Sequence, residues 1–247
     1  MTYTEPVRIA LAAVLGLVAA AGNLLGGYFV VRKDWPRHFL QYFLALGAGY
    51  MLAVAFLEII PESIRLAGES ALLWVLAGYF LVHLFEHTLA PHFHFGEETH
   101  DDVMRAGNAS TSALIGLLIH TFFDGVAIAA GFLVSTWLGV AIFIAVFLHK
   151  LPEGFTVASL MLAGGQSRRT ALLSSVFLGV ATLLGVFLTS ALRGQLRYAL
   201  PLSGGVALYV AATDLMPEVN REPRGWVPVL VFLGVASLFL LHHFFHL

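Results

Sequence analysis

The 247-residue chain is 59% hydrophobic and only 11% charged, with a mean hydropathy of +0.85. Soluble domains contain roughly 45–50% apolar and about 25% charged residues, so this composition excludes a water-soluble globule. The formal net charge of -2 gives no reason to expect nucleic-acid binding. The chain has no cysteine, which excludes disulfides, thiolate metal ligands and cysteine nucleophiles.

Eight apolar runs are each long enough to cross a bilayer, which takes about 20 helical residues. Charged residues, prolines or glycine-rich polar clusters separate these runs. The predicted spans are 6–31, 38–60, 70–90, 110–133, 136–163, 170–192, 198–219 and 226–246. The first run is too long for the apolar core of a secretory signal, so we interpret it as a spanning helix. The pattern predicts an all-α polytopic membrane protein with a single transmembrane domain over residues 1–247.

Basic residues in the loops predict the orientation of the chain. Eight lie on one side of the predicted membrane, namely Arg32, Lys33, Arg37, Arg105, Arg168, Arg169, Arg221 and Arg224. The other side has four, namely Arg8, Arg65, Arg193 and Arg197. Because cytoplasmic loops carry an excess of Lys and Arg, we predict that the first side is cytoplasmic and that both termini lie outside.

The loop at 91–109, on the predicted cytoplasmic side, is rich in histidine and acid. It contains His92, His94, Glu97, Glu98, His100, Asp101 and Asp102. These residues have no regular helical spacing, so the segment is interpreted either as a weak metal-binding loop or as a plain polar loop.

Two internal matches indicate a repeat. At an offset of 156 residues, a set of second-span residues falls on identical residues of the seventh span: Gly49, Leu52, Val54, Ala55, Pro61 and Glu62 match Gly205, Leu208, Val210, Ala211, Pro217 and Glu218. The same offset places Glu58 on Asp214. The two spans run in opposite directions, as in the inverted repeats of secondary transporters.

The second match, at an offset of 29 residues, relates the fourth span to the fifth. It places His120, Asp124 and Gly125 on His149, Glu153 and Gly154. The predicted plan is therefore eight transmembrane helices in a 3+2+3 inverted-repeat arrangement, with three helices, two central helices and three more.

Ionisable residues lie inside the predicted spans, where each charge costs about 2.5–3.5 kcal/mol. They are Glu58, Glu62, His120, Asp124, His149, Lys150, Glu153, Asp214 and Glu218. One lysine cannot neutralise six carboxylates, so these groups are hydrated, protonated or gathered around a cation. His120 and Asp124 are one helical turn apart, as are His149 and Glu153, so each pair projects from one helix face.

Two such faces offer two imidazoles and two carboxylates to one ion. Zn²⁺, Fe²⁺ and Mn²⁺ accept such mixed nitrogen and oxygen ligands. A proton-relay or packing network without metal is the alternative. Pro152 frees a backbone carbonyl next to this face and is expected to kink the helix.

Further acids and one thioether are candidates for the same cavity. Met51 and Glu58 are seven residues apart on the second span, and Asp214 is the repeat partner of Glu58. Core filling is the alternative for Met51. Glu62 and Glu218 stand near helix ends, where they serve either as gating residues or as ordinary interfacial acids.

The segment His83-Leu-Phe-Glu86-His87 matches the H-x-x-E-H pattern of a zinc protease class. It stands at the predicted cytoplasmic end of the third span, so we interpret it as a helix terminus or a weak interfacial metal site. His242, His243 and His246 are interpreted as an interfacial terminus.

The paired segments His120-Thr-Phe-Phe-Asp124-Gly125 and His149-Lys-Leu-Pro152-Glu153-Gly154 resemble the signature of the ZIP (Zrt/Irt-like protein) family of divalent metal transporters. The resemblance extends over nearly the whole chain. It implies uptake of Zn²⁺ or a similar ion into the cytoplasm, with one helix group moving like an elevator against a scaffold that dimerises. By position, the resemblance implies that His120, Asp124, His149 and Glu153 are the central metal ligands. It adds Met51 and Glu58 from the second span and Asp214 from the seventh.

The chain departs from the family pattern at two positions. Thr121 stands where many members have Asn, and Lys150 stands where members with two metal ions have Asp or Asn. An ammonium has no lone pair for a metal and repels a second dication. We therefore expect one bound metal ion, and we expect Lys150 to pair with Asp214 or Glu153 when the site is empty.

The expected function is secondary transport of a divalent ion by alternating access. Zn²⁺ is the first candidate as substrate, with Fe²⁺, Mn²⁺ and Cd²⁺ open, and we expect no resident cofactor and no enzymatic activity. The chain has no Walker-type phosphate loop. We expect a homodimer in a lipid bilayer, most simply a bacterial inner membrane. The alternatives are an intramembrane zinc hydrolase and a proton-coupled carrier of another substrate.

Overall fold

The computed structural model describes residues 3–32, 37–88, 109–220 and 225–245, and these residues are almost entirely helical. The longer helices are α1 (Glu5–Arg32), α2 (Arg37–Val54), α4 (Ser70–Thr88), α6 (Ala109–Val134), α7 (Thr136–Ala163), α8 (Arg168–Ala191), α9 (Leu196–Tyr209) and α11 (Trp226–Phe245). The shorter elements are the π-helical turns η1 (Ala55–Ile59) and η3 (Val210–Leu215), the 3-10 turn η2 (Arg193–Gln195), and the helices α3 (Ile60–Ala67) and α10 (Met216–Asn220).

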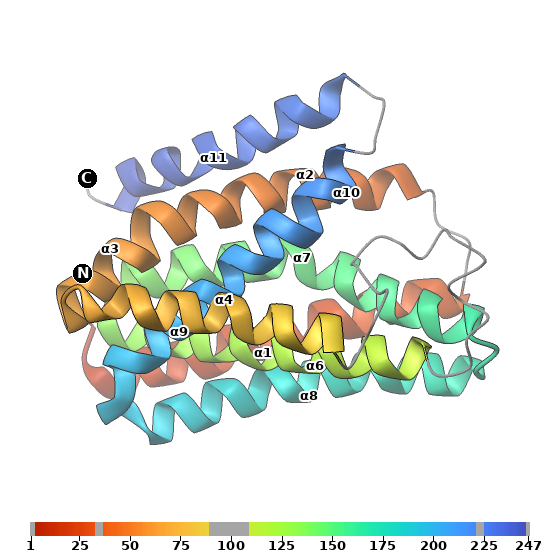
Figure 1. Ribbon diagram of the computed structural model, residues 1–247, viewed down its shortest axis with the longest axis horizontal. Coiled ribbons are helices and arrows are strands. Elements are labelled where there is room, and N and C mark those ends of the chain that lie inside the picture. The colour runs from red at the N-terminus through yellow and green to blue at the C-terminus, as the bar shows by residue number, and fades with distance from the viewer. Residues whose placement is uncertain (1–2, 33–36, 89–108, 221–224, 246–247) are drawn as a thin grey trace.

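Seven helices of the described residues are long and apolar enough to cross a membrane. The remaining predicted span, the seventh (198–219), corresponds to α9, η3 and α10, which form one helical path from Leu196 to Asn220. The helices run roughly along the long axis of the bundle, and both marked termini lie at the same end (Figure 1). The prediction of an all-α polytopic membrane protein is confirmed.

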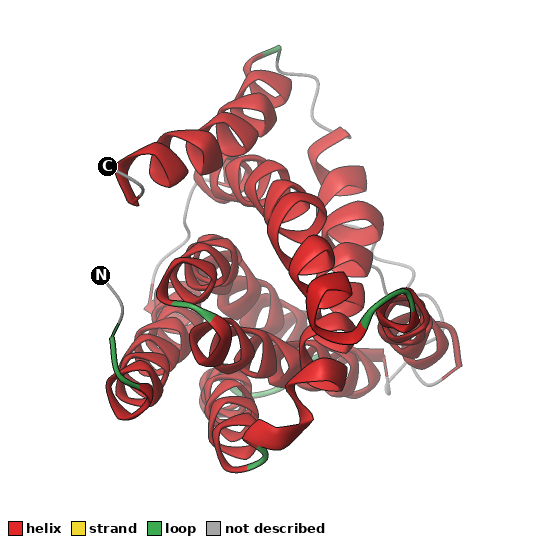
Figure 2. Ribbon diagram, turned by 90° about the vertical axis from the view of Figure 1, so that its left-hand side faces the viewer, coloured by secondary structure: helices red, strands yellow, loops and turns green. Residues whose placement is uncertain are grey.

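The helices divide into two groups by their packing. The first group contains α1, α6, α7 and α8, and the second contains α2 with α3, α4, α9 with α10, and α11. We call them the α1/α6/α7/α8 group and the α2/α4/α9/α11 group. They meet mainly where α2 packs on α7 and α9 packs on α6. Figure 2 shows the bundle from the end that carries both termini, with α11 at its outer edge.

Close helix contacts confirm the inverted repeat because they occur in matched pairs. A Cβ on Gly49 of α2 would lie 2.0 Å from the carbonyl oxygen of Val231 on α11. At the same offset of 156 residues, a Cβ on Gly205 of α9 would lie 1.9 Å from the carbonyl oxygen of Val75 on α4. The α2–α11 and α9–α4 contacts are therefore equivalent, and only glycine lets these backbones approach so closely.

The π-helical turns also repeat. In η1 the N–H of Ile60 bonds to the carbonyl of Ala55, and in η3 the N–H of Met216 bonds to that of Ala211. Each turn ends two residues before the proline of the repeated Pro-Glu pair, and that proline has no N–H to donate to the helix. The helical path of the second span consequently continues beyond the predicted end at residue 60, as far as Ala67.

Candidate metal site

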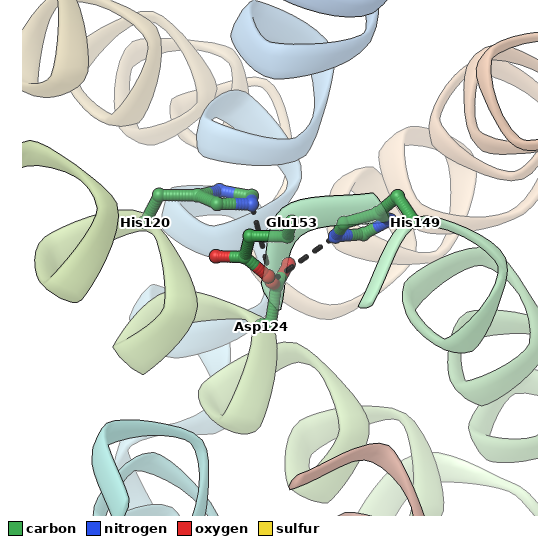
Figure 3. A group of neighbouring side chains, drawn as sticks. All are labelled: His120, Asp124, His149 and Glu153. Atoms are coloured by element: carbon green, nitrogen blue, oxygen red, sulfur yellow. Dashed lines mark hydrogen bonds and ion pairs between the residues drawn. The ribbon is translucent and has the colours of Figure 1, made fainter. Parts of the chain in front are cut away.

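Four of the predicted ligands come together between α6 and α7. One ligand atom from each of His120, Asp124, His149 and Glu153 lies within 4.8 Å of the others. The residues are 5%, 3%, 1% and 0% exposed, respectively. In Figure 3 the two imidazoles lie on either side of the two carboxylates. Within the described residues, this is the one group of three or more such side chains that can hold a metal ion.

Glycines on the two central helices hold this group in place. A Cβ on Gly125 of α6 would lie 1.9 Å from the carbonyl oxygen of Thr182 on α8. A Cβ on Gly154 of α7 would lie 2.0 Å from that of Asn23 on α1. Because each glycine directly follows a candidate acid, close packing of α6 on α8 and of α7 on α1 fixes the position of both carboxylates.

Asp124 faces both imidazoles. Its Oδ2 atom is 3.2 Å from Nε2 of His120 and 3.2 Å from Nε2 of His149. Nδ1 of His149 is 2.9 Å from the carbonyl oxygen of Ala145, which only accepts, so Nδ1–H donates there. In the neutral ring this leaves a lone pair on Nε2, directed at an acceptor oxygen. A cation or a proton between these two acceptors resolves the conflict.

The buried ammonium of Lys150 lies beside the same carboxylates. Its Nζ atom is 2.6 Å from Oδ2 of Asp124 and 2.5 Å from Oε2 of Glu153. It also donates to the hydroxyl of Thr121 at 3.3 Å. Of the two alternatives expected for Lys150, the pairing with Glu153 is present, and the pairing with Asp124 was not expected.

Glu153 is also held by neutral donors. The Thr121 hydroxyl donates to its Oε1 atom. In the amide orientation that satisfies both neighbours, Asn23 of α1 donates to Oε2 of Glu153 at 3.2 Å and to the carbonyl of Lys150 at 2.7 Å. Asn23 is completely buried. The sequence analysis missed this residue, although an asparagine inside an apolar span is a signal of function.

The remaining predicted ligands lie outside the four-residue group. Met51 is 2% exposed on α2, one turn after Gly47, whose Cβ would touch the backbone of α7 at Leu148 and His149. Helical spacing therefore places Met51 on the face of α2 that meets α7. Asp214 is buried in η3, and the Thr213 hydroxyl donates to it at 3.3 Å.

Glu58 lies near the end of the bundle that holds both termini. Its Oε1 atom is 3.6 Å from Nδ1 of His242 on α11. Glu58 lines a cavity of about 400 Å³ together with Glu62, Arg65 and Trp137. Glu62 accepts two hydrogen bonds from Arg65, at 2.8 and 2.5 Å.

The H-x-x-E-H segment at the end of α4 forms a different set of contacts. Glu86 accepts a hydrogen bond from the buried Tyr209 of α9 at 2.8 Å. The ring of His83 stacks against that of His87, with centroids 4.1 Å apart. Unlike the four residues of the central site, His83, Glu86 and His87 do not bring their ligand atoms close enough together to hold a metal ion. The predicted histidine-rich loop lies outside the described residues, as do His246 and the side chain of Glu218.

Comparison with known proteins gives the family. Residues 6–112 and 92–242 match the family model described as ZIP zinc transporter. An uncharacterized protein of Methanocaldococcus jannaschii is 29% identical over 164 residues, which are 64% of this chain and 64% of that protein. Zinc transporter ZIP9-B of Xenopus laevis is 23% identical over 62% of this chain and 63% of its own length.

Zinc transporter ZIP4 of Homo sapiens is 32% identical over 52% of this chain, but the match covers only 19% of that protein. The chain thus spans less than two thirds of the curated relatives it matches. The matched family segments cover most of the chain, so it belongs to the ZIP zinc transporter family, a family of transporters rather than enzymes. It is an integral, multi-pass membrane protein.

Proposed function

We propose that this member of the ZIP family is a secondary carrier that moves one divalent ion, first of all Zn²⁺, into the cytoplasm. The observation that carries the proposal is the buried group of two imidazoles and two carboxylates between antiparallel central helices. Such groups are costly inside a membrane unless an ion or proton joins them. The group lies between the two repeat-related helices, and secondary carriers bind their substrates at such interfaces of inverted repeats.

The ligand chemistry favours zinc among the candidate ions. Zn²⁺ binds histidine nitrogen and carboxylate oxygen, usually with four ligands. The Nδ1–H bond from His149 to Ala145 directs the opposite nitrogen into the site, as metal-binding histidines require. Fe²⁺, Mn²⁺ and Cd²⁺ remain candidate substrates because imidazole and carboxylate ligands also accept them.

Met51, Glu58 and Asp214 complete the proposed path of the ion. Met51 lies on the face of α2 toward α7 and offers a thioether to the central site. Glu58 lines the cavity at the end that holds the termini, and Asp214 lies in the matching π-helical turn of the other repeat. π-helical turns occur frequently at functional sites, which supports roles for both acids.

Polar contacts support a movement of the two helix groups against each other. Arg8 of α1 donates to the carbonyls at the end of α6, and Arg168 of α8 donates to the carbonyl of Val31 on α1. Both links lie inside the α1/α6/α7/α8 group. The Tyr209–Glu86 bond lies inside the other group. In this proposal the first group carries the ion, and the second forms a scaffold that dimerises within the bilayer.

The orientation belongs to the same proposal. The termini and the Glu58 cavity face the outside, and the loop after α4 faces the cytoplasm. Positive charge is enriched on the latter side of the chain. A bacterial inner membrane is the simplest location.

Zinc flux tests the proposal. Radioactive Zn²⁺ uptake into proteoliposomes is measured for the native chain, His149→Ala and Glu153→Ala, with Fe²⁺, Mn²⁺ and Cd²⁺ as competitors. We expect saturable uptake by the native chain and its loss in both variants. Arg193→Gln serves as the control, because it removes an exposed ion pair to Glu5. Bound zinc without flux would instead favour an enzyme or a sensor, and flux of another substrate in chelator would favour a different carrier.

A further inference from the structure

Lys150 is the only lysine or arginine among the buried residues that the structure describes. Its ammonium bridges the two carboxylates of the central site, at 2.6 Å from Asp124 and 2.5 Å from Glu153. A Cβ on Gly22 of α1 would lie 3.1 Å from the Cβ of Lys150, so α1 leaves space for this side chain. The position is therefore built to hold a cation between the two acids.

The two repeat-related central helices carry different residues at this position. At the offset of 29 residues that relates His120 to His149, Lys150 corresponds to Thr121. The two equivalent side chains touch, because Nζ of Lys150 donates to Oγ1 of Thr121 at 3.3 Å. One half of the repeat thus supplies a fixed positive charge, and the other supplies a neutral hydroxyl that helps to hold it.

Lys150 changes the charge of the site in both transport states. With neutral imidazoles, the two carboxylates and the ammonium give the empty site a net charge of −1, and one divalent ion raises it to +1. Without Lys150, the same states would carry −2 and 0. The energy of a charge in a poorly polarisable medium rises with the square of that charge. Lys150 therefore lowers the energy needed to move the empty site through the bilayer, because the site carries a net charge of −1 instead of −2. The loaded site carries a net charge of +1.

We propose that Lys150 is a tethered counter-cation that takes the place of the transported ion between Asp124 and Glu153 when the site is empty. The incoming ion displaces the ammonium from Asp124, and release of the ion lets the ammonium return. The ammonium belongs to α7 and travels with the site, so the empty carrier resets without a second dissolved cation. This inference rests on the proposed carrier function.

Two flux measurements separate the return step from the loaded step. Net uptake of Zn²⁺ into zinc-free proteoliposomes requires the empty carrier to return. Exchange of radioactive Zn²⁺ between equal zinc concentrations on the two sides requires only the loaded carrier to move. Both fluxes are measured at zinc concentrations that saturate each variant, and for Lys150→Met we expect net uptake to fall by about tenfold or more relative to exchange. Arg193→Gln, the exposed ion-pair control, is expected to keep both.

A charge swap gives the second variant. Lys150→Thr combined with Thr121→Lys supplies the ammonium to the same carboxylates from α6. We expect this double variant to recover net uptake relative to Lys150→Met, which a purely structural role of Lys150 on α7 would not produce.

The outcomes separate the two proposals. Unchanged net uptake in Lys150→Met, or parallel loss of uptake and exchange in both Lys150 variants, would overturn the counter-cation role while the native chain still transports zinc. Absence of both fluxes in the native chain would overturn the carrier function itself.

Discussion

Glu153 accepts hydrogen bonds from side chains on three helices. Thr121 donates from α6, Lys150 from α7 itself, and Asn23 from α1. Such partners orient a ligand and set its basicity, and their loss typically reduces metal affinity by about 10–100-fold. Lys150 also contacts Asp124 and Thr121 also contacts Lys150, whereas the Asn23 side chain bonds to Glu153 and to a backbone carbonyl, so its effect on Glu153 can be tested without changing the ammonium's side-chain partners.

Replacing Asn23 should weaken zinc binding. In Asn23→Leu, Glu153 and the carbonyl of Lys150 lose a donor while the branched shape and the number of side-chain heavy atoms are kept. We expect the dissociation constant for Zn²⁺ to rise by about 10–100-fold. A competition titration with a fluorescent zinc chelator in detergent measures it.

Thr182→Val is the matched control for this change. Thr182 contacts Gly125 through its backbone as Asn23 contacts Gly154, but its hydroxyl donates only within its own helix, to the carbonyl of Leu178. It should bind zinc as the native chain does. Equal affinities for both variants would show that Asn23 does not position Glu153.

At the residue scale, the sequence predicted what depends on spacing along one helix. The i, i+4 pairs at 120/124 and 149/153 follow from helical geometry, and the structure brings all four residues together. Contacts between helices were harder to predict from the sequence. The pairing of Glu58 with His242 and the hydrogen bond from Asn23 depend on where η1 lies relative to α11 and on how α1 packs on α7, which no local pattern encodes.

The central helices depend on close backbone packing. Gly125 on α6 and Gly154 on α7 each abut a carbonyl of a neighbouring helix. A methyl group at either position has no space, and overpacking of this kind costs about 1–3 kcal/mol.

Gly125→Ala and Gly116→Ala provide a comparison on a single helix. The first would push α6 away from Thr182, so we expect the melting temperature in detergent to fall. The second meets no atom within 4 Å and replaces glycine by a better helix former, so the melting temperature should stay or rise. A similar drop for both variants would contradict the packing argument.

At the element scale, the sequence repeat predicted the relation between the second and seventh spans but not its local form. The identical residues around Pro61 and Pro217 revealed equivalent segments. The π-helical turns before them were not predicted, because apolar periodicity does not distinguish a turn closed five residues back from one closed four residues back.

The predicted number of membrane crossings is even, so both ends of the chain are expected on the same side of the membrane. Glu69, between α3 and α4, and Gln166, between α7 and α8, are exposed, and these two connections lie at opposite ends of the bundle (Figure 1). Because the chain has no cysteine, single cysteines can report the orientation without background. In intact cells we expect a membrane-impermeant thiol reagent to label Glu69→Cys, and to label Gln166→Cys only after permeabilisation. The reverse pattern would contradict the proposed direction of uptake.

Zinc stoichiometry tests the central claim that one ion binds between the two central helices. Equilibrium dialysis of the purified chain is compared with that of the His120→Ala/His149→Ala double variant, so that weak binding by other histidines cancels. The account predicts a difference of one Zn²⁺ per chain, because the ammonium of Lys150 offers no lone pair and repels a second dication. A difference of two ions, or no difference at all, would contradict it.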